Sequence, residues 1–440
     1  MTPGLALFYG GMVRAKSVLN MMMMSFGALA LISVLWVLYG YSMSFGNDVG
    51  GGLLGDPTEF FALQSLIGTS GLDGGFQANN LVFTIPSLAF VAFQSVFAII
   101  TVALISGAIA DRAKFGAWMV FAGIWASVVY FPVAHWVFAF DEAESESGGW
   151  IANRLLAIDF AGGTAVHINA GAAALALAIV VGRRRGFGFE AMRPHNLPLV
   201  MIGAGLLWFG WFGFNAGSAL SANGQAAEVW VTTMSATAAS CLSWLLTEKV
   251  RDGHATSLGA ASGIVAGLVA ITPACAAVTP LGALAIGVIA GVFCALAVGL
   301  KYRLGYDDSL DVVGVHLVGG LVGTVTIGFF ASSDATAGVD GLLYGGGVDQ
   351  LWRQVLAALA VMLFSFVLSF ILGFVIDRTM GFRIAEDDEE AGIDNLVHAE
   401  TGYDFSALGA GGSGSPPTSA TALGASTFTV PARTTEGTSA

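Results

Sequence analysis

Two histidines stand inside long apolar runs of the chain, and each follows an aspartate at the same distance. In DFAGGTAVHINAG, His167 lies eight residues after Asp159, and in DDSLDVVGVHLVGG, His316 lies eight residues after Asp308. An imidazole accepts and donates protons near neutral pH, and ionisable groups inside a membrane typically mark a transport path. We therefore expect His167 and His316 to serve transport, with a proton relay between them as one use.

Other interpretations of these motifs stay open. An aspartate at a helix start caps free N–H groups and suits the positive end of the helix dipole. Asp159 fits this role as well as a direct one, whereas Asp308 and Asp311 favour capping. A membrane enzyme with a metal held by these side chains is less consistent with the spacing, because eight residues turn a helix ~80° beyond two full turns. We expect no enzyme activity, no cofactor and no metal.

The composition places these motifs in membrane helices. Of the 440 residues, 55% are hydrophobic and only 11% are charged, whereas a soluble domain has roughly 25% charged residues. Only helices or closed barrels satisfy the backbone in lipid, and alternation at period two is absent. The sequence therefore predicts an all-α polytopic membrane protein embedded in a lipid bilayer. The net charge of -13 argues against nucleic acid as a partner.

Ten apolar runs predict complete spans, because about 20 apolar residues cross the hydrocarbon core. They are Met21–Phe45, Leu81–Ala110, Phe115–Phe140, Gly162–Val181, Leu197–Ser218, Val229–Leu246, Thr256–Ile271, Pro280–Leu300, Val313–Phe330 and Leu351–Ile376. Met1–Val13 adds an eleventh, apparently truncated helix, since at ~1.5 Å per residue it covers only about half of a ~30 Å core. Either this helix is a half-span or the sequence lacks its beginning.

The loops predict how the bundle sits in the membrane. Fourteen of the seventeen Lys and Arg residues fall in loops on one side, which the positive-inside rule places in the cytoplasm. The N-terminus is then outside, the C-terminus is inside, and the cytoplasmic membrane is the expected location. The two Asp-x7-His segments belong to the fifth and tenth spans, so they run in opposite directions, as in an inverted five-helix repeat with a site near the midplane.

The remaining features divide the chain and supply few further sites. We expect a transmembrane domain at 1–384, a cytoplasmic segment at 385–407 with a short helix, and a disordered tail at 408–440, where Gly, Ser, Thr, Ala and Pro dominate. The cysteines Cys241, Cys275 and Cys294 read as small packing residues. The histidines His135, His195 and His254 read as interface or loop residues, and His398 belongs to the tail. On pattern alone, the aromatic residues of FQSVFAIIT and WFGFNAGS read as interface anchors or packing residues.

Four segments together resemble the ammonium transporter family (Amt/Mep, related to the Rh proteins). They are PGLALFYGGMVRAKSVLNMMMM, DFAGGTAVHINAG, WFGFNAGSA and DDSLDVVGVHLVGG, and the resemblance extends from Met1 to Phe405. It implies a homotrimer with one pore per subunit and eleven helices, the first ten of which form an inverted repeat. A cytoplasmic end like that of the family also implies a PII-type nitrogen-regulatory partner.

The resemblance also implies roles for single residues. Phe97, Phe138 and Ser218 match the site that recruits ammonium, and Asp159 matches the acid that supports that site. Phe97 and Phe214 match the gate, and His167, His316 and Trp211 match the pore lining. The family often has Trp where this chain has Phe138, with Trp136 two residues earlier. Since Trp is the best cation–π partner, this difference predicts weaker capture of the cation.

These expectations combine into one function. Ammonium binds outside, loses its proton near the gate, and crosses as ammonia through an apolar pore lined by the two histidines. The alternative is an ammonium sensor that acts through a cytoplasmic partner. Since the chain carries no fused signalling domain between Met1 and Ala440, transport is the favoured reading.

Overall fold

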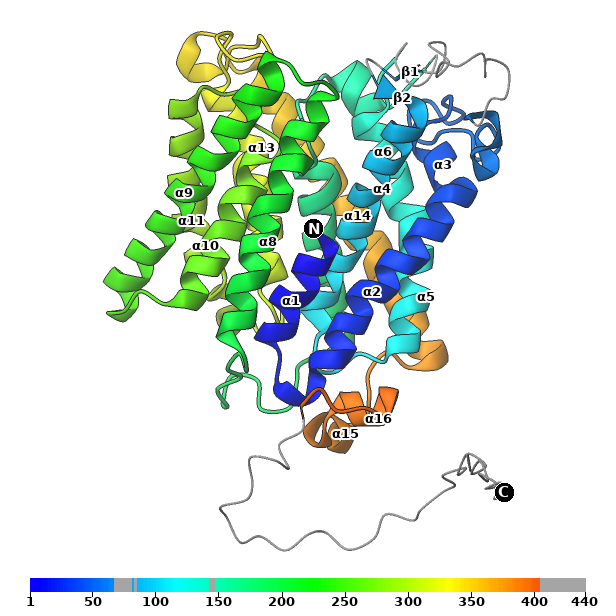
Figure 1. The fold of residues 1–440 in the computed structure, drawn as a ribbon, viewed down its shortest axis with the longest axis vertical. Helices are drawn as coiled ribbons and strands as arrows, with labels where there is room; N and C mark the ends of the chain where they lie inside the picture. Colours follow the sequence, from blue (N-terminus) through cyan, green and yellow to red (C-terminus); the bar gives the residue numbers. More distant parts are fainter. Residues whose placement is uncertain (67–80, 83–84, 142–146, 404–440) are drawn as a thin grey trace, which may run out of the picture. The chain divides into compact units, whose positions relative to one another are not determined.

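Long helices that run side by side make up most of the described chain (Figure 1). The computed structural model describes residues 1–66, 81–82, 85–141 and 147–403. The unit Met1–Gly402 contains every element discussed below. The tail predicted to be disordered, 408–440, lies outside the described residues.

The first half of the chain contains α-helices, several short 3-10 or π-helical turns, labelled η, and one small sheet. In order they are α1 (Thr2–Met12), η1 (Ala15–Ser17), α2 (Val18–Leu35), η2 (Trp36–Gly40), α3 (Tyr41–Phe45), η3 (Phe61–Leu66), β1 (Leu81–Val82), β2 (Ile85–Pro86), α4 (Ser87–Ile105), η4 (Ser106–Ile109), α5 (Phe115–Trp125), η5 (Ala126–Tyr130), α6 (Phe131–Phe138), η6 (Ile151–Leu155), η7 (Gly163–Ile168) and α7 (Asn169–Val181).

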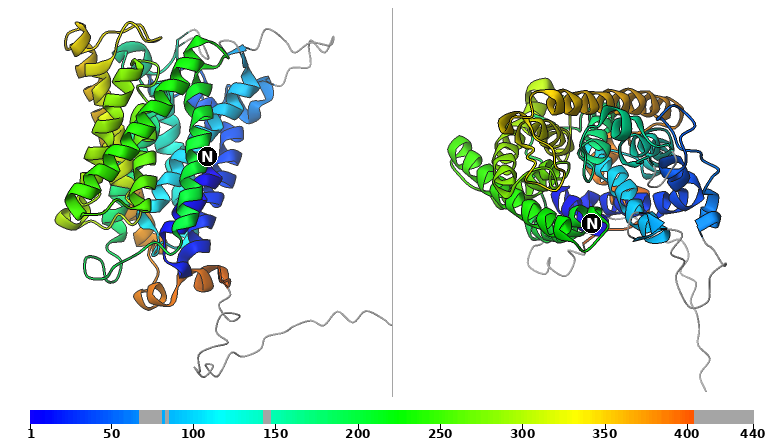
Figure 2. Two further views of the ribbon diagram at one scale, coloured as in Figure 1. Left: turned by 60° about the vertical axis from the view of Figure 1, so that its left-hand side comes forward. Right: turned by 90° about the horizontal axis from the view of Figure 1, so that it is seen from above.

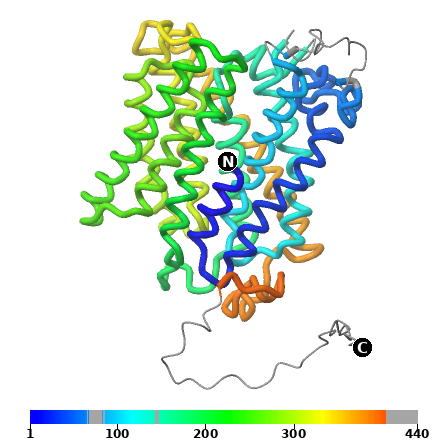
Figure 3. The backbone as a smooth tube through the Cα atoms, viewed as in Figure 1, coloured from blue at the N-terminus to red at the C-terminus, as the bar shows by residue number. Residues whose placement is uncertain are grey.

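The second half continues in the same manner and ends with two short helices. Its elements are α8 (Leu197–Asn215), η8 (Ala216–Ala219), α9 (Gly224–Asp252), α10 (Ser257–Ile271), α11 (Pro280–Ala297), α12 (Leu300–Leu304), η9 (Val313–Leu317), α13 (Val318–Phe330), η10 (Leu342–Tyr344), α14 (Asp349–Met380), α15 (Glu386–Ala391) and α16 (Ile393–His398). The tube in Figure 3 traces the same path without the helical ribbon.

The number of apolar helices agrees with the prediction. Among the described residues, nine helical segments are long and apolar enough to cross a membrane. The shorter apolar helix α10 adds one more, and the 11-residue helix α1 lies where the sequence predicted a truncated helix. The all-α polytopic fold is therefore confirmed.

Two predicted spans had inaccurate boundaries, for local reasons. The span predicted from Leu81 begins at Ser87, because β1 and β2 pair as a two-stranded antiparallel sheet just before it. The span predicted at Val229–Leu246 begins at Gly224, where the Asn223 side chain caps the helix by accepting the Ala226 N–H, and ends at Asp252, where Gly253 adopts a left-handed conformation. Hydropathy finds the apolar centre of a helix but not its polar ends.

Glycines bring the two histidine-bearing segments into contact. A Cβ atom at Gly171 of α7 would lie 2.5 Å from the backbone nitrogen of Leu317 in η9. A Cβ atom at Gly320 of α13 would lie 3.0 Å from the Ile168 side chain in η7. Each segment thus offers a glycine to the other, and small residues allow such close approach between membrane helices. Figure 2 gives two further views of the bundle.

Buried ion pairs hold the end of the bundle where α7 ends. Arg184 binds Asp307 through two nitrogens, at 2.8 and 2.9 Å, and lies 3.2 Å from Asp111. Arg112 donates to the backbone oxygen of Asp307 at 2.6 Å. Burial by itself would raise the pKa of Asp307, but the Arg184 hydrogen bonds and the Arg112 charge hold this pKa below its usual value. Burial lowers the pKa of Arg112 to about 10.

The two short C-terminal helices lie at this same end, beside the start of α2 (Figures 1 and 3). The Asp394 carboxylate accepts the N–H groups of Leu19 and Asn20, at 2.9 and 2.8 Å. Glu389 accepts from Arg383 at 2.7 Å and from the Arg185 N–H at 3.0 Å. These contacts tie 386–398 to the loops that carry the basic residues.

Candidate functional site

The two aspartates of the repeated motif cap the segments that hold the histidines. Asp159 accepts the N–H groups of Gly162, Gly163 and Thr164 at 2.6 to 2.8 Å, the more distant Ala165 N–H at 3.3 Å, and the Thr164 hydroxyl. These N–H donors lie at the start of η7. The first N–H groups of a helix have no partner within the helix. The carboxylate is therefore engaged mainly in holding the backbone.

Asp308 has the equivalent place before η9. Its carboxylate accepts the N–H groups of Val312 and Val313, at 3.1 and 2.7 Å. Asp311 instead binds Lys301, whose ammonium lies 2.6 Å from the Asp311 carboxylate. Asp308 is thus a cap, in agreement with the sequence, while Asp311 is the partner of a lysine.

The histidines of the two segments meet inside the bundle. The Nδ1 atoms of His167 and His316 lie 3.3 Å apart, although 149 residues separate them in sequence. Both side chains are buried, and their ring planes differ by only 21°. A neutral imidazole has one N–H, so this contact is a hydrogen bond when one of the two Nδ1 atoms holds a proton. The other ring then carries its proton at Nε2.

Both histidines stand on π-helical turns, η7 and η9. Such turns inside an α-helix are rare and frequently occur at functional sites. A residue added to a turn rotates the side chains that follow it relative to an α-helix. This rotation is invisible to arguments that assume 3.6 residues per turn, such as the ~80° estimate from the sequence.

Aromatic rings continue from the histidine pair toward one end of the bundle. The Trp211 indole stacks on His167, with ring centroids 5.5 Å apart and planes 17° apart. Phe214 contacts Trp211 edge to face at 5.6 Å. The rings of Phe214 and Phe97 then stack at 3.9 Å, and both side chains are buried. The predicted gate and pore residues therefore form one continuous array of rings.

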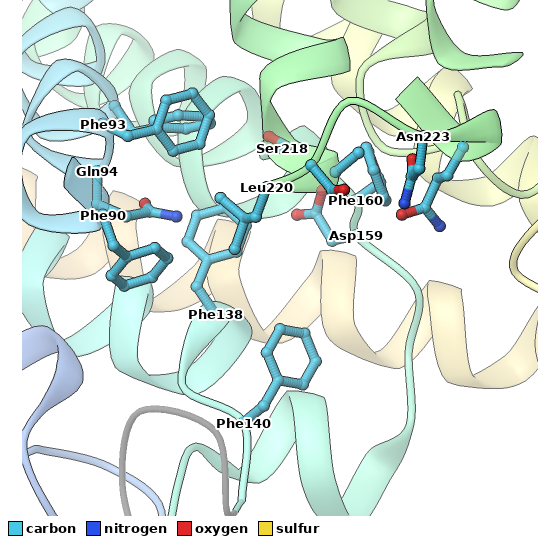
Figure 4. Close-up of a pocket in the computed structure, with 14 residues that line it drawn as sticks. Phe90, Phe93, Gln94, Phe138, Phe140, Asp159, Phe160, Ser218, Leu220 and Asn223 are labelled. Carbon is cyan, nitrogen blue, oxygen red and sulfur yellow. The ribbon is translucent and has the colours of Figure 1, made fainter. Parts of the chain in front are cut away.

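A cavity of about 360 Å³ lies next to this array (Figure 4). Its lining includes all four residues that the sequence placed at a recruitment site, namely Phe97, Phe138, Ser218 and Asp159. The Ser218 hydroxyl donates to the backbone oxygen of Phe214 at 2.9 Å, which leaves its lone pairs free to accept from a ligand. Aromatic faces with a hydroxyl acceptor suit a small cation that donates hydrogen bonds.

Sequence reasoning missed several residues of this lining. Phe90, Phe93 and Gln94 come from α4, and Phe160 and Asn223 come from two loops (Figure 4). A signal was available for the first group, because Phe93 and Gln94 lie four and three residues before Phe97, on the same helix face. No pattern of spacing pointed to the loop residues.

Trp136 does not replace the aromatic ring that Phe138 provides. Its indole nitrogen donates to the Leu53 oxygen at 2.8 Å, and its ring packs against Phe364 and Trp150. Phe138 instead faces the cavity and lies 6.0 Å from Phe97, near perpendicular. The ring at this position of the cavity is therefore phenylalanine.

The other histidines lie apart from the pair. His135, expected at an interface or in a loop, belongs to the last turn of α6 and is fully buried, with Nδ1 3.1 Å from the Ser44 oxygen and Nε2 3.5 Å from Asp48. The loop after α3 folds over the end of α6 and covers it. His195 contacts the Val13 oxygen at 2.8 Å. Within the described residues, no group of three or more His, Cys, Asp or Glu side chains converges as a metal site would require.

The chain matches known proteins over nearly its full length. Residues 1–403 match the Ammonium Transporter Family. The ammonium transporter of Mycobacterium tuberculosis strain H37Rv is 62% identical over 95% of this chain and 89% of that protein. The ammonium transporter of Bacillus subtilis strain 168 is 44% identical over 92% and 95%, respectively.

Solved structures show the same fold. The Mep2 protein of Saccharomyces cerevisiae superposes with a TM-score of 0.77 at 34% identity, covering 88% of this chain and 84% of that one. A structure described as a sensor Amt protein superposes with a TM-score of 0.80 at 29% identity, covering 89% and 93%.

A bundle of apolar helices that matches transporters of this family over residues 1–403 is a multi-pass membrane transport protein. More narrowly, the chain belongs to the ammonium transporter family, and ammonium is what it transports.

Proposed function

We propose that this protein selects ammonium by removing its proton and conducting ammonia through the apolar passage that contains His167 and His316. The observation that carries the proposal is the contact between these two buried imidazoles, 3.3 Å apart, behind the stacked rings of Phe97 and Phe214. A passage closed by aromatic rings and furnished with two imidazoles suits a neutral molecule that forms hydrogen bonds.

Selectivity follows from the cost of charge in such a passage. Ammonium and potassium ions are similar in charge and size, so a pore lined by carbonyl oxygens would separate them poorly. Moving a bare ion into a dry interior costs on the order of 20 kcal/mol in an idealised estimate. Ammonium alone can avoid this cost, because it can lose a proton and cross as ammonia.

Recruitment begins in the cavity that Phe97, Phe138 and Ser218 line. Each ring contributes about 0.5–2 kcal/mol of cation–π attraction, and the Ser218 hydroxyl accepts a hydrogen bond from the ion. Asp159 acts at a distance: its oxygens hold the start of η7, while its negative charge favours a cation nearby. Beyond the Phe97–Phe214 gate the ion transfers its proton to the lone pair of His167 Nε2, which has no other partner among the described residues, and continues as ammonia.

The histidine pair then receives ammonia and passes on the proton. His167 Nε2 is buried and has no hydrogen-bond partner among the described residues, so it can bond to a molecule in the passage. If one proton lies between the two Nδ1 atoms, its transfer from one ring to the other moves charge without an ion in the pore. This is the arrangement that a proton relay needs.

The test is ammonium-evoked current in vesicles that contain the purified protein, with potassium as the competing cation. We expect current with ammonium and little with potassium. His167→Asn and His316→Asn, which keep a polar group but cannot titrate, should each reduce the proton-linked current. Equal currents for the two ions in the wild type, or unchanged current and selectivity in both variants, would contradict the proposal.

The same family membership supports wider proposals about assembly and location. We infer a homotrimer in the cytoplasmic membrane, with the N-terminus outside and the C-terminus inside, and regulation by a PII-type protein at the cytoplasmic face. Native mass spectrometry of the protein in detergent tests the trimer. Binding of a PII-type protein to that face tests the regulation.

A sensor is the second candidate function, favoured by the structural similarity to the sensor Amt protein. A sensor would bind ammonium and change its affinity for a cytoplasmic partner while conducting little. The vesicle experiment separates the two functions, because a sensor would show ammonium binding without a matching current.

A further inference from the structure

Trp211 has a hydrogen-bond partner that lies at the end of a different helix and away from the histidines. Its indole nitrogen donates to the hydroxyl of Thr272 at 2.7 Å. Thr272 follows the last residue of α10, whereas Trp211 belongs to α8, and both side chains are buried. A buried indole N–H requires a partner, and Thr272 supplies it.

The Thr272 hydroxyl is itself held in place. It donates to the Leu268 oxygen at 2.7 Å and lies 3.3 Å from the side-chain oxygen of Asn215. Asn215 in turn donates to the Thr233 hydroxyl at 3.0 Å. Asn215, Thr233 and Thr272 are all fully buried. The partner of the Trp211 indole is therefore part of a connected polar network that links α8, α9 and α10, and such networks restrict a side chain to one orientation.

The orientation of Trp211 determines what lies beside His167. The indole stands between Phe214 and His167, with centroid distances of 5.6 and 5.5 Å. If the indole turned away, the space beside the His167 ring would open to water. Water beside the imidazoles would lower the cost of a charged species in the passage.

We propose that Thr272 is a positioning residue for the transport path: its hydroxyl fixes the Trp211 indole against His167, and this contact maintains discrimination against other cations. The inference rests on the proposed function, because it takes the passage beside His167 as the route of ammonia. Thr272 touches neither histidine and acts only through Trp211.

The test compares Thr272→Val, which keeps the shape but removes the hydroxyl, with Thr272→Ser, which keeps the hydroxyl. The readout is the ratio of ammonium-evoked to potassium-evoked current in the same vesicles, which does not depend on how much protein is inserted. We expect Thr272→Val to lower this ratio by about tenfold, equivalent to about 1.4 kcal/mol. In Thr272→Ser the ratio should stay at the wild-type value.

A double-mutant cycle shows whether the effect passes through Trp211. Trp211→Phe removes the indole N–H, so Thr272→Val should lower the ratio no further in that background. Thr237→Val is the matched control, because Thr237 is equally buried but donates within its own helix, to the Thr233 oxygen at 2.7 Å. Its ratio should stay at the wild-type value.

Three results would overturn the proposal. They are an unchanged current ratio in folded Thr272→Val, a further fall of the ratio when Thr272→Val is added to Trp211→Phe, and a fall of the ratio in Thr237→Val as large as that in Thr272→Val. If Thr272→Val does not fold, Trp211→Phe decides alone, and an unchanged ratio in that variant rejects the role. Failure of the proposed function looks different, because the wild-type protein itself would then not discriminate between the two ions.

Discussion

The rings of Phe97 and Phe214 stack at 3.9 Å with planes 19° apart, between the aromatic cavity and Trp211. One ring comes from α4 and the other from α8. In the transport path that we propose, this contact between two helices closes the passage, and a rotation of either side chain would open it. Rotamer changes of this kind are small motions that leave the backbone in place.

Removing one ring of this stack should reduce selectivity. In Phe214→Ala the passage toward Trp211 loses its cover, and hydrated cations can approach the histidines. We expect the potassium current, relative to the ammonium current, to rise about tenfold, equivalent to about 1.4 kcal/mol of barrier. Phe212→Ala is the control on the same helix, because the Phe212 ring stacks on Trp230 at 4.0 Å. Equal ratios in both variants would exclude Phe214 as the gate.

Phe138→Trp should strengthen the capture of ammonium. The Phe138 ring lines the cavity, and Trp offers a stronger cation–π contact than Phe, with about 0.5–1 kcal/mol as the scale of the gain. We expect the ammonium concentration at half-maximal current to fall by a factor of about two to five. Trp136→Phe should leave this concentration unchanged, since Trp136 packs on Phe364 and Trp150. A rise in the Phe138→Trp variant would argue against cation–π recruitment.

Asp159→Asn should destabilise the protein more than Asp308→Asn. Asn presents one acceptor oxygen and an N–H₂ group to the N–H donors of η7, so several hydrogen bonds to a charged group are lost, at about 1.5–3 kcal/mol each. Asp308 caps only two N–H groups, so Asp308→Asn should lose less stability than Asp159→Asn. Thermal unfolding of both variants in detergent measures the difference. The reverse order of stability would refute the capping role assigned to Asp159.

The Arg184–Asp307 pair should make stability depend on pH. The folded protein favours ionised Asp307, whose pKa is lowered. Its contribution is therefore complete above the ordinary carboxyl pKa of about 3.9, and it is lost as the pH falls through the lower pKa of the folded state. Unfolding temperatures measured from pH 7 down to pH 3 should show this loss.

Arg184→Gln provides the contrast. This variant leaves the buried Asp307 charge without its main partner, at a cost of roughly 3–5 kcal/mol near neutral pH. Protonation of Asp307 then removes that cost, so acidification should narrow the gap to the wild type. Arg183→Gln is a suitable control, because Arg183 binds only the Gly305 backbone oxygen among its hydrogen bonds in the described chain. A constant gap across the pH range would contradict the assignment.

Much of this architecture can be predicted from hydropathy and the positions of charges. Apolar runs of about 20 residues require helices in lipid, and nine helical segments of the described residues are long and apolar enough to cross a membrane. The paired aspartates and histidines are also visible in the sequence, because polar groups inside apolar runs are conspicuous. Boundaries such as those of α4 and α9 were less accurate, since caps and short strands act over only a few residues.

The candidate site itself depended on contacts between distant segments. The aspartate and histidine of each motif are fixed by sequence, but the meeting of His167 and His316 requires the close packing of η7, η9 and the glycines beside them. Phe93, Gln94 and Asn223 became part of the cavity only when α4, α8 and the loop before α9 came together.

By itself, then, the sequence determined the membrane class, the number of helices, the family resemblance and the residue types available for chemistry. Those properties arise from solvation and local helix geometry, which act within about one helix length. Only the tertiary structure decided which lone pairs Asp159 uses, that Phe138 and not Trp136 faces the cavity, and that Thr272 holds Trp211. These depend on side-chain packing between helices, where a shift of an ångström makes or breaks a hydrogen bond.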